Sequence, residues 1–597
     1  MSDVPNLRIR VITSPDQVAE FWEWLTRPDR RMVACDLETT GLDWWSPGFR
    51  IRLAQFGDTD GGWAIPYQGW PALVHGALDW CSYHRVPVVF HNGIGFDALA
   101  FRSQGYHLDW TNLEDTFVWA AVTGWADQDR MLKHLAVREF GGWAAAGDRV
   151  LKAGMKNAGW DWATVPMDWK PYPMYGVVDT CITAGLWEAW EPRRARWAND
   201  HALEVATARI VNDMMWNGTG TDGDYLFQEI VGHQEREEEI EAQLKALGIT
   251  NPAQNGQLEL VLQKDGYPLA EKTASGKAKL DKDVLAHIDH PAAKLVLEHR
   301  WVHRVVTSYL QPIFEGAGGQ LGRGILHPNI KPIEARTGRM SVEHPPLQQL
   351  PSGDPVVRQG IIGRSDDDVV ISSDFGQIEL RLWGSINNDQ PMLDALKNAD
   401  ATGGDFFVEL GKTIYGEPDF VKKDHRRTLL KSTVYAKLFG GGIETAAATA
   451  GVNVYSLVPT WKALEAAYPS LKTLGENLIK TRKLPGDQGV EHVITSPWGR
   501  EFKVKDSQER RKLGNYVTQG SAAITLKKAL VSLDAAGFGP HMMLPVHDEV
   551  LFSIPKTQAD EAKAEIAACM DAIIDADQWG IAVKAEPGVG VNWAEAK

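Results

Sequence analysis

The stretch VVISSDFGQIELR, at residues 369–381, decides how this chain folds. Its apolar, β-branched first half predicts a buried strand that ends at Asp374. Past Gly376, Ile378 and Leu382 recur at helical spacing, so a helix is expected to follow the strand. A carboxylate at a strand end, above a turning backbone, is a natural ligand for a hard metal ion. Taken alone, Asp374 would more often be the N-cap of the following helix.

A second strand-like run, MMLPVHDEVLF at residues 542–552, gives Asp374 a partner. Apolar residues flank the polar centre His547-Asp548-Glu549, which is typical of a hairpin with acidic residues at its tip. Two strand-borne aspartates that meet in space can hold two Mg²⁺ ions, as in-line displacement at phosphorus requires. The two runs together therefore predict a catalytic centre built on Asp374 and Asp548.

The composition is that of a large globular protein. At 597 residues the chain is expected to form three or four domains, and its 44% hydrophobic content allows an ample core. The net charge of −16 argues against a nucleic-acid binder. Screening limits the reach of each charge to about 10 Å, however, so the net charge does not exclude a basic cleft within an acidic protein. The four cysteines form no CxxC pair, and no run of about 18 apolar residues occurs, so we expect a cytoplasmic protein without membrane contact.

Four acids in the first 195 residues stand at element ends or on single faces. Asp36 and Glu38 lie two residues apart, hence on one face of an apolar strand. Asp97 follows a strand and a Gly-containing turn, near a helix N-terminus, where a capping role is the alternative. Tyr175 and Asp179 lie one helical turn apart, although a buried tyrosine and a surface carboxylate would also explain them. Such a set of acids is what a two-metal phosphodiesterase site requires.

These residues resemble, in order and spacing, the three signature motifs of the DEDD-type 3′→5′ exonucleases in their tyrosine-containing variety. The motifs are Asp36-x-Glu38, Asn92-x-x-x-Phe96-Asp97 and Tyr175-x-x-x-Asp179. The resemblance implies an RNase H-like domain in which the four acids hold two divalent ions and Tyr175 orients the attacking water. Asp115 also stands where that fold often has an acid.

Two further helices are expected to carry polar faces. The first helix carries Arg427, Lys431, Tyr435 and Phe439, and the second carries Arg511, Asn515 and Gln519. Within each set the residues are spaced at intervals of four, so they are expected to lie on one face of the helix. In the first, two cations and then two aromatics offer a surface for a triphosphate and a base. A basic amphipathic helix would explain the cations but not the aromatics, and Gly440–Gly442 is expected to end it. The second stripe suits hydrogen bonds in a minor groove, with a solvated polar face as the alternative.

From about residue 30 to its end, the chain resembles a family A DNA polymerase (the DNA polymerase I superfamily) with a proofreading domain. The resemblance rests on residues 369–381, 427–439, 511–519 and 547–549, and on EARTGRM at residues 334–340. It implies a multidomain α/β and α+β fold, with an exonuclease domain before a polymerase shaped like a right hand. The implied domains are the exonuclease (1–195), thumb (196–325), palm (326–385 and 504–597) and fingers (386–503).

The resemblance also implies roles for single residues. Asp374 and Asp548 bridge two Mg²⁺ ions, with Mn²⁺ as an alternative, and Lys431 can protonate the leaving group. The implied nucleotide-binding residues are Arg427, Lys431, Tyr435, Phe439, Gln377 and Glu379, the last as a sugar gate. The implied DNA-binding residues are Arg339, Arg511, Asn515, Gln519 and His547.

The implied function is template-directed addition of dNTPs to a primer 3′-OH, with 3′→5′ proofreading, by a monomer acting on primer–template DNA. Because the exonuclease motifs begin at Asp36, no 5′ nuclease is expected, as in bacteriophage replicative enzymes. The sequence does not identify any replisome protein as a partner. The rivals are a 3′→5′ exonuclease whose C-terminal half only binds DNA, and a non-catalytic DNA-binding scaffold. The presence of Asp374, Lys431 and Asp548 speaks against the first, and the presence of every expected acid speaks against the second.

Four positions depart from the family pattern. Tyr435 stands where many relatives have Phe, so its hydroxyl is expected to replace a sugar 3′-OH contact and dideoxynucleotides to be accepted. Phe439 replaces a usual Tyr, so Glu379 is expected to lose a hydroxyl partner. Gln349 replaces an Asn that contacts the template, and Phe407 replaces a His that contacts a phosphate.

Overall fold

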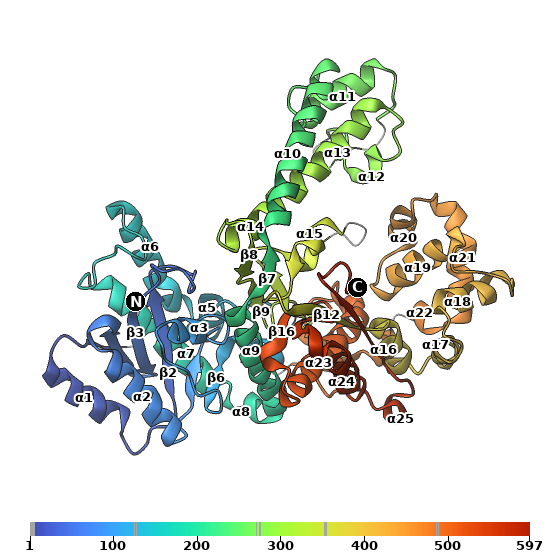
Figure 1. Ribbon diagram of the computed structural model, residues 1–597. Coiled ribbons are helices and arrows are strands. Elements are labelled where there is room, and N and C mark those ends of the chain that lie inside the picture. Colours follow the sequence, from blue (N-terminus) through green and yellow to red (C-terminus); the bar gives the residue numbers. More distant parts are fainter. Residues whose placement is uncertain are drawn as a thin grey trace.

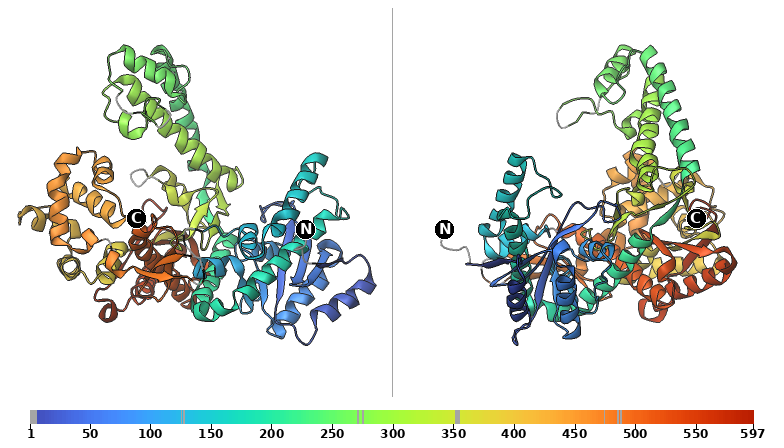
Figure 2. Two further views of the ribbon diagram at one scale, coloured as in Figure 1. Left: turned by 180° about the vertical axis from the view of Figure 1, so that it is seen from behind. Right: turned by 60° about the vertical axis from the view of Figure 1, so that its left-hand side comes forward.

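The computed structural model describes residues 6–597 except 125, 127, 270–271, 274–275, 351–354, 474, 485 and 487–488. The chain forms three lobes around a central base (Figure 1). The N-terminal lobe lies at one side, a pair of long helices projects from the base, and a helical lobe lies at the other side (Figure 1, Figure 2). Among the described residues, no helix has both the length and the apolar character needed to cross a membrane.

The N-terminal lobe is built on a six-stranded sheet in the order β1-β4-β3-β2-β5-β6. Its strands are β1 (Arg8–Val11), β2 (Val33–Thr39), β3 (Ile51–Asp58), β4 (Gly61–Pro66), β5 (Val88–Phe90) and β6 (Leu113–Asp115). Strand β2 pairs antiparallel with β3 and parallel with β5, so it lies inside the sheet. Carboxylates on such a strand lose much of their hydration.

Helix α7 (Pro171–Ala189) packs on this sheet and brings Tyr175 and Asp179 to it. The approach is close because Gly176 faces the sheet, where a Cβ atom would collide with the side chain of Gln55. The other helices of the lobe are α1 (Pro15–Leu25), α2 (Pro71–Tyr83), α3 (Asp97–Ser103), α4 (Thr116–Thr123), α5 (Leu132–Phe140), α6 (Ala146–Ala158) and the short α8 (Glu191–Arg194).

The base contains a four-stranded antiparallel sheet in the order β16-β17-β12-β18. The strands are β12 (Asp368–Phe375), β16 (Met542–Val546), β17 (Glu549–Pro555) and β18 (Ala585–Gly590). The register sets Asp374 opposite Glu549 on one side and Glu586 on the other. The predicted strand and the predicted hairpin are thus neighbours in one sheet. Helix α24 (Ala559–Asp571) packs on this sheet and α23 (Leu513–Ala535) packs on α24.

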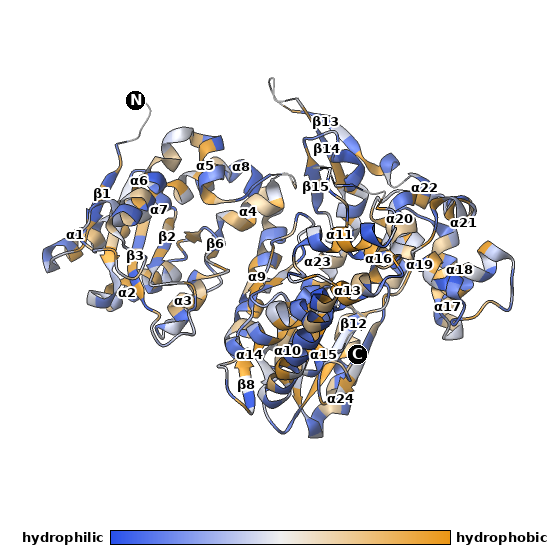
Figure 3. Ribbon diagram, turned by 90° about the horizontal axis from the view of Figure 1, so that it is seen from above, coloured by the Kyte–Doolittle hydropathy of each residue, from blue (hydrophilic) through white to orange (hydrophobic). Residues whose placement is uncertain are grey.

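The projecting helices are α10 (Gly223–Ala246) and α13 (Pro291–Val305), with α11 (Asn255–Lys264) and α12 (Lys282–Leu285) at their far end (Figure 1). These elements enclose an apolar core of their own. Seen from above, α10 is largely hydrophilic, as its many glutamates require (Figure 3). Helix α9 (Ala198–Asn217) leads into this projection and packs against α23.

The helical lobe follows α16 (Ile378–Ile386) and has its own apolar core. Its helices are α17 (Gln390–Thr402), α18 (Phe406–Tyr415), α19 (His425–Leu438), α20 (Ile443–Ala450), α21 (Val454–Ala467) and the short α22 (Ser470–Thr473). Helix α19 ends as predicted, since Gly440 has a φ of 74°, a left-handed conformation that favours glycine. Phe407 is only 2% exposed and packs in this core, which accounts for an aromatic residue at that position.

The described structure also contains three smaller sheets. They are β11 (Ile361–Ile362), β7 (Thr219–Asp222) and β8 (Arg323–Leu326); β10 (Ser341–Glu343) and β9 (Asn329–Lys331); and β13 (Lys480–Lys483), β14 (Val490–Thr495) and β15 (Glu501–Val504).

A buried ion cluster ties α9 to α23. Glu204 accepts hydrogen bonds from Arg500 at 2.7 Å and from Lys527 at 2.5 Å. The side chains of Glu204 and Lys527 are fully buried. Lys527 also donates to the carbonyl of Gly338 at 2.7 Å, next to Arg339. Burial lowers the pKa of Lys527 to about 8, against the opposing effect of Glu204. The cluster therefore connects the N-terminal half of the chain to the segment that carries Arg339.

We expect Glu204→Ala to lower the free energy of unfolding by about 3–5 kcal/mol, because Arg500 and Lys527 would stay buried without their counter-ion. Asp200→Ala removes a less buried carboxylate from Arg500 and is expected to cost about 1–2 kcal/mol. Urea titration followed by tryptophan fluorescence measures both losses. Equal losses in the two variants would contradict the importance of the buried cluster.

Candidate active sites

The ends of β12 and β17 bring Asp374 and Asp548 together. The turn between β16 and β17 contains His547 with a φ of 58°, an uncommon conformation for a residue other than glycine. In the same turn, the Asp548 carbonyl accepts a hydrogen bond from the Phe375 amide at 3.4 Å, so the backbone beside Asp374 contacts that of Asp548. The two aspartates that the sequence analysis paired therefore lie at adjoining ends of neighbouring strands.

The electrostatics of the pair favour a bound cation. Burial, and next the charges of Asp548 and Glu549, raise the pKa of Asp374 to about 7. Burial also raises the pKa of Asp548, although Arg339 opposes that shift. Two carboxylates that are costly to ionise side by side become stable when a positive ion neutralises them.

Glu549 is held on the sheet. It accepts hydrogen bonds from Ser372 Oγ at 2.5 Å and Trp593 Nε1 at 2.7 Å, and it forms an ion pair with Lys597. With its carboxylate engaged in this way, Glu549 anchors Trp593 against the sheet. Asp548 is therefore the acid of the hairpin tip that is available to a ligand.

Glu379 on α16 is paired with Arg339. Burial raises the pKa of Glu379, and the guanidinium of Arg339 opposes this shift. The expectation that Glu379 loses its partner when Phe439 replaces a tyrosine is therefore incomplete, because an arginine supplies the donor. Gln377 precedes α16 in a left-handed conformation, with a φ of 53°. Its buried Oε1 atom lacks a hydrogen-bond partner within the described part of the chain.

Helix α19 brings Tyr435 near these acids. Tyr435 lies close enough that Glu379, Asp548 and Asp374 raise the pKa of its hydroxyl, after burial as the main cause. Lys431 is exposed. Phe439 lies just past the last residue of α19, with its ring centre 5.8 Å from that of Tyr435.

Arg427, on the same helix, is engaged with Asp405. Its Nε atom donates to Asp405 Oδ1 at 3.0 Å, and Asp405 in turn caps α18 through the amide of Val408. The sequence analysis missed this pair, since no spacing marks Asp405 as a partner of Arg427. A phosphate at Arg427 would have to compete with this carboxylate.

Helix α23 is mostly buried, and Asn515 and Gln519 are partly exposed members of its polar stripe. The Oδ1 atom of Asn515 has no hydrogen-bond partner among the residues described. The expectation of one continuous helical face is wrong for Arg511, which lies in the 3₁₀ turn η7 (Arg510–Lys512) before α23. Successive residues turn by a larger angle there, so Arg511 departs from the line of the two amides.

A second cluster of acids lies in the N-terminal lobe. Asp36 and Glu38 are on β2, Asp97 begins α3 and Asp179 is on α7. Burial raises the pKa of Asp36 to about 6. Burial, followed by the charge of Asp36, raises the pKa values of Glu38 and Asp97 well above their usual range. The structure therefore brings together the acids that the sequence placed far apart.

Lys133 on α5 stands among these acids, and the sequence analysis missed it. It forms an ion pair with Asp179, and its Nζ atom lies 4.7 Å from the ring centre of Tyr175. Burial lowers the pKa of Lys133 to about 8, against the opposing charges of Asp36 and Glu38. No spacing in the sequence connects this lysine to the motifs.

Asp115 has a structural role in the described chain. It accepts hydrogen bonds from the amides of Asn92 at 3.0 Å and Phe117 at 2.8 Å, and it caps α4. These bonds fix the turn that leads into Asp97.

Both acid clusters fit divalent cations. Each contains a buried carboxylate oxygen, Asp374 Oδ1 in one and Asp97 Oδ1 in the other, without a hydrogen-bond partner in the described residues. Carboxylate oxygens are the ligands that Mg²⁺ and Mn²⁺ prefer.

Comparison with known proteins identifies the fold. A solved structure described as the POL domain of Pol1 from M. smegmatis, in complex with DNA primer-template and dNTP, has a TM-score of 0.77 at 18% identity. The alignment covers 99% of this chain and 100% of that one. The chain therefore shares the fold of that POL domain, with mixed α and β structure.

Sequence relatives narrow the assignment. Residues 226–595 match the family described as DNA polymerase family A, and the chain belongs to this family. The DNA polymerases of Mycobacterium phages D29 and L5 are 26% and 25% identical, each over 98% of this chain and 96% of the relative. DNA polymerase I of Lactococcus lactis is 27% identical over 58% of this chain and 40% of the relative. The expected family resemblance is confirmed, and DNA-directed DNA synthesis is the supported activity.

Proposed function

We propose that this DNA polymerase extends a primer 3′ end at the Asp374–Asp548 centre and removes misfit ends at the Asp36 cluster. The observation that carries the proposal is the meeting of Asp374 and Asp548 at one sheet edge, where burial and mutual repulsion raise the pKa of Asp374. The proposed role is replicative, in a monomer of bacteriophage origin that works in the host cytoplasm. The relatives from two phages support that role.

In the proposed polymerase site, Asp374 and Asp548 hold two Mg²⁺ ions, or Mn²⁺ in their place. When bound, such ions activate the primer 3′-OH and neutralise charge on the leaving pyrophosphate. Exposed Lys431 binds the triphosphate and can protonate the leaving group. Arg427 joins it by exchanging Asp405 for a phosphate oxygen, since both are charge-assisted acceptors for a guanidinium.

The remaining polar groups position the reactants. We assign Tyr435, Phe439, Gln377 and Glu379 to the sugar and base of the nucleotide, and Arg339, Arg511, Asn515, Gln519 and His547 to primer–template contacts. The unpartnered Asn515 Oδ1 supports a donor from DNA at that point. Contacts of this kind recognise backbone and shape, while base pairing supplies the sequence.

In the proposed exonuclease site, Asp36, Glu38, Asp97 and Asp179 hold two divalent ions and Tyr175 orients the attacking water. Lys133 supplies positive charge beside Asp179 and stacks its ammonium on Tyr175, which supports the placement of both residues. The mixed six-stranded sheet, with Asp36 and Glu38 on the inner strand β2, supports an RNase H-like domain. We propose the domain limits 1–195, 196–325, 326–385 with 504–597, and 386–503 for exonuclease, thumb, palm and fingers.

Primer extension tests the proposal against a C-terminal half that only binds DNA. The purified protein, a 5′-labelled primer on a longer template, all four dNTPs and Mg²⁺ are expected to yield template-length product, and chelation of Mg²⁺ is expected to stop it. Degradation of the primer without any extension, even at high dNTP concentration, would favour the rival function.

We expect Tyr435→Phe to disfavour dideoxynucleotides by about 10- to 100-fold relative to dNTPs, because it removes a hydroxyl that can replace the missing sugar 3′-OH contact. The selectivity is measured from competing dNTP and dideoxynucleotide incorporation. Tyr455→Phe, at an 86% exposed tyrosine of α21, is the matched control and should leave selectivity unchanged. Wild-type selectivity in Tyr435→Phe would show that its hydroxyl has no such contact.

A further inference from the structure

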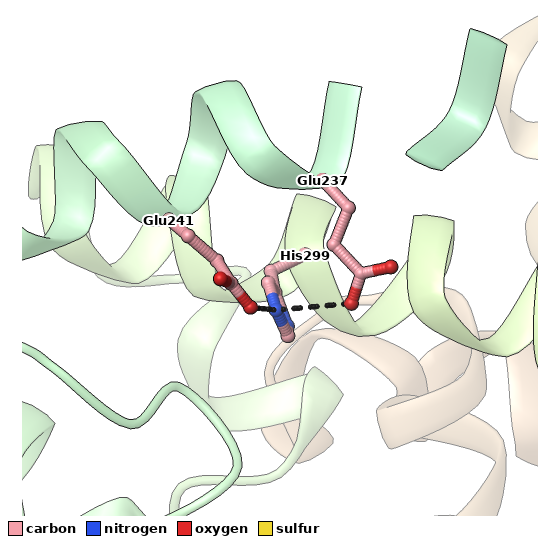
Figure 4. A group of neighbouring side chains, drawn as sticks. All are labelled: Glu237, Glu241 and His299. Carbon is pink, nitrogen blue, oxygen red and sulfur yellow. Dashed lines mark hydrogen bonds and ion pairs between the residues drawn. The ribbon is translucent and has the colours of Figure 1, made fainter. Parts of the chain in front are cut away.

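A cluster of histidine and carboxylate side chains joins the two projecting helices. Glu237 and Glu241 lie one turn apart on α10, and His299 and His303 lie one turn apart on α13. Glu237, Glu241 and His299 point toward one another (Figure 4). Their ligand atoms all lie within 4.8 Å of one another.

The distances around His299 fit those between the ligands of a metal ion. Its Nε2 atom lies 3.3 Å from Glu237 Oε1 and 3.1 Å from Glu241 Oε1. A single N–H group cannot point at two oxygens in good alignment. Ligand atoms of a tetrahedral ion with bonds of about 2.0–2.2 Å are separated by roughly 3.3–3.6 Å, close to these distances.

Burial and neighbouring contacts arrange the cluster in advance. The His299 side chain is 8% exposed, whereas that of Glu241 is 53% exposed, so the cluster opens to solvent on one side. His303 Nδ1 lies 2.8 Å from Glu237 Oε1, and its ring stacks on His299 with an interplanar angle of 7°. A hydrogen bond of this kind orients a metal-binding carboxylate.

We propose that Glu237, Glu241 and His299 bind a first-row divalent metal ion, of which Zn²⁺ is the best match, and so clamp α10 to α13. Two carboxylates and a neutral imidazole balance the charge of the ion. Imidazole with carboxylate oxygens suits zinc, while Mg²⁺ and Ca²⁺ prefer oxygen ligands alone. The fourth position opens to solvent beside Glu241 and takes water. This site is separate from both acid clusters and does not depend on the proposed catalytic function.

Zinc binding by the full chain tests the proposal. The protein is freed of metal by a chelator, returned to excess Mg²⁺ to fill the acid-only sites, and titrated with Zn²⁺ by calorimetry. The wild type is expected to bind one zinc equivalent more than His299→Gln. Titration with Co²⁺ should give the intense visible absorption of a tetrahedral site in the wild type, and this absorption should be lost in the variant.

Further variants make the outcome decisive. Glu241→Gln alters a half-exposed side chain, so it tests the site even if His299→Gln fails to fold. His303→Ala should weaken zinc binding by about 10- to 100-fold, as expected for loss of an orienting hydrogen bond. His233→Gln, on α10 beside Glu229, is the matched control and should bind as the wild type does. Equal zinc stoichiometry and affinity in the wild type and Glu241→Gln would overturn the proposal and leave an ion-pair cluster only.

Discussion

Asp374→Asn is expected to reduce DNA synthesis by at least about 10³-fold, equivalent to about 4 kcal/mol of transition-state stabilisation. The amide keeps the shape of the side chain but removes the negative charge that would hold a divalent ion beside Asp548. Single-turnover extension of a matched primer measures the loss. Degradation of single-stranded DNA should continue at the wild-type rate, because the Asp36 cluster lies in another lobe (Figure 1).

A control variant separates this role from a general effect of charge. Glu586→Gln removes an exposed acid directly opposite Asp374 in the sheet register and is expected to retain synthesis within a few-fold. A comparable loss in both variants would mean that Asp374 acts only through the net charge of the sheet edge.

Stability should move in the opposite direction from activity in Asp374→Asn. The folded protein holds the pKa of Asp374 at about 7, above its value in an unfolded chain, so ionisation of this group destabilises the fold. The cost is absent at low pH, where the group is protonated in both states, and develops as the pH rises above about 4. In metal-free buffer at neutral pH, the amide variant should therefore melt at a higher temperature than the wild type. A lower melting temperature would contradict the assigned repulsion.

The sequence was most informative where local pattern and chemistry coincide. The β-branched run ending at Asp374 and the apolar hairpin around Asp548 each have a strand signature and an acid at its end. A buried strand leaves few other positions for a carboxylate, so the meeting of the two acids could be predicted before the sheet was known. Lys431 and Tyr435 likewise lie one turn apart in the structure, as the sequence predicts, because both belong to helix α19.

Other features depend on tertiary placement that no local pattern encodes. Lys133 reaches the acid cluster because α5 lies beside α7, and nothing in its own helix marks that neighbour. The pairs Arg339–Glu379 and Arg427–Asp405 join segments 40 and 22 residues apart. Arg511 was misplaced for a different reason, since 3₁₀ and α turns at a helix start have similar sequences.

Asp36→Asn is expected to reduce 3′→5′ degradation by at least about 10³-fold while leaving extension of a matched primer unchanged. Asp36 lies close to two other acids of its cluster, because its charge raises the pKa values of both Glu38 and Asp97. If the cluster binds divalent ions as proposed, loss of that charge removes one of their ligands. Release of nucleotides from a labelled single strand, with Mg²⁺ and without dNTPs, measures the effect.

The same variant should also change the fate of a mismatched primer. If the Asp36 cluster proofreads, the wild type removes a mismatched terminal nucleotide before extending the primer, whereas Asp36→Asn retains the mismatch in its product. Sequencing of the extended strands distinguishes the two. Asp43→Asn removes an equal charge from an exposed position shortly after β2 and should behave as the wild type does. Continued degradation by Asp36→Asn would place the nuclease centre elsewhere in the chain.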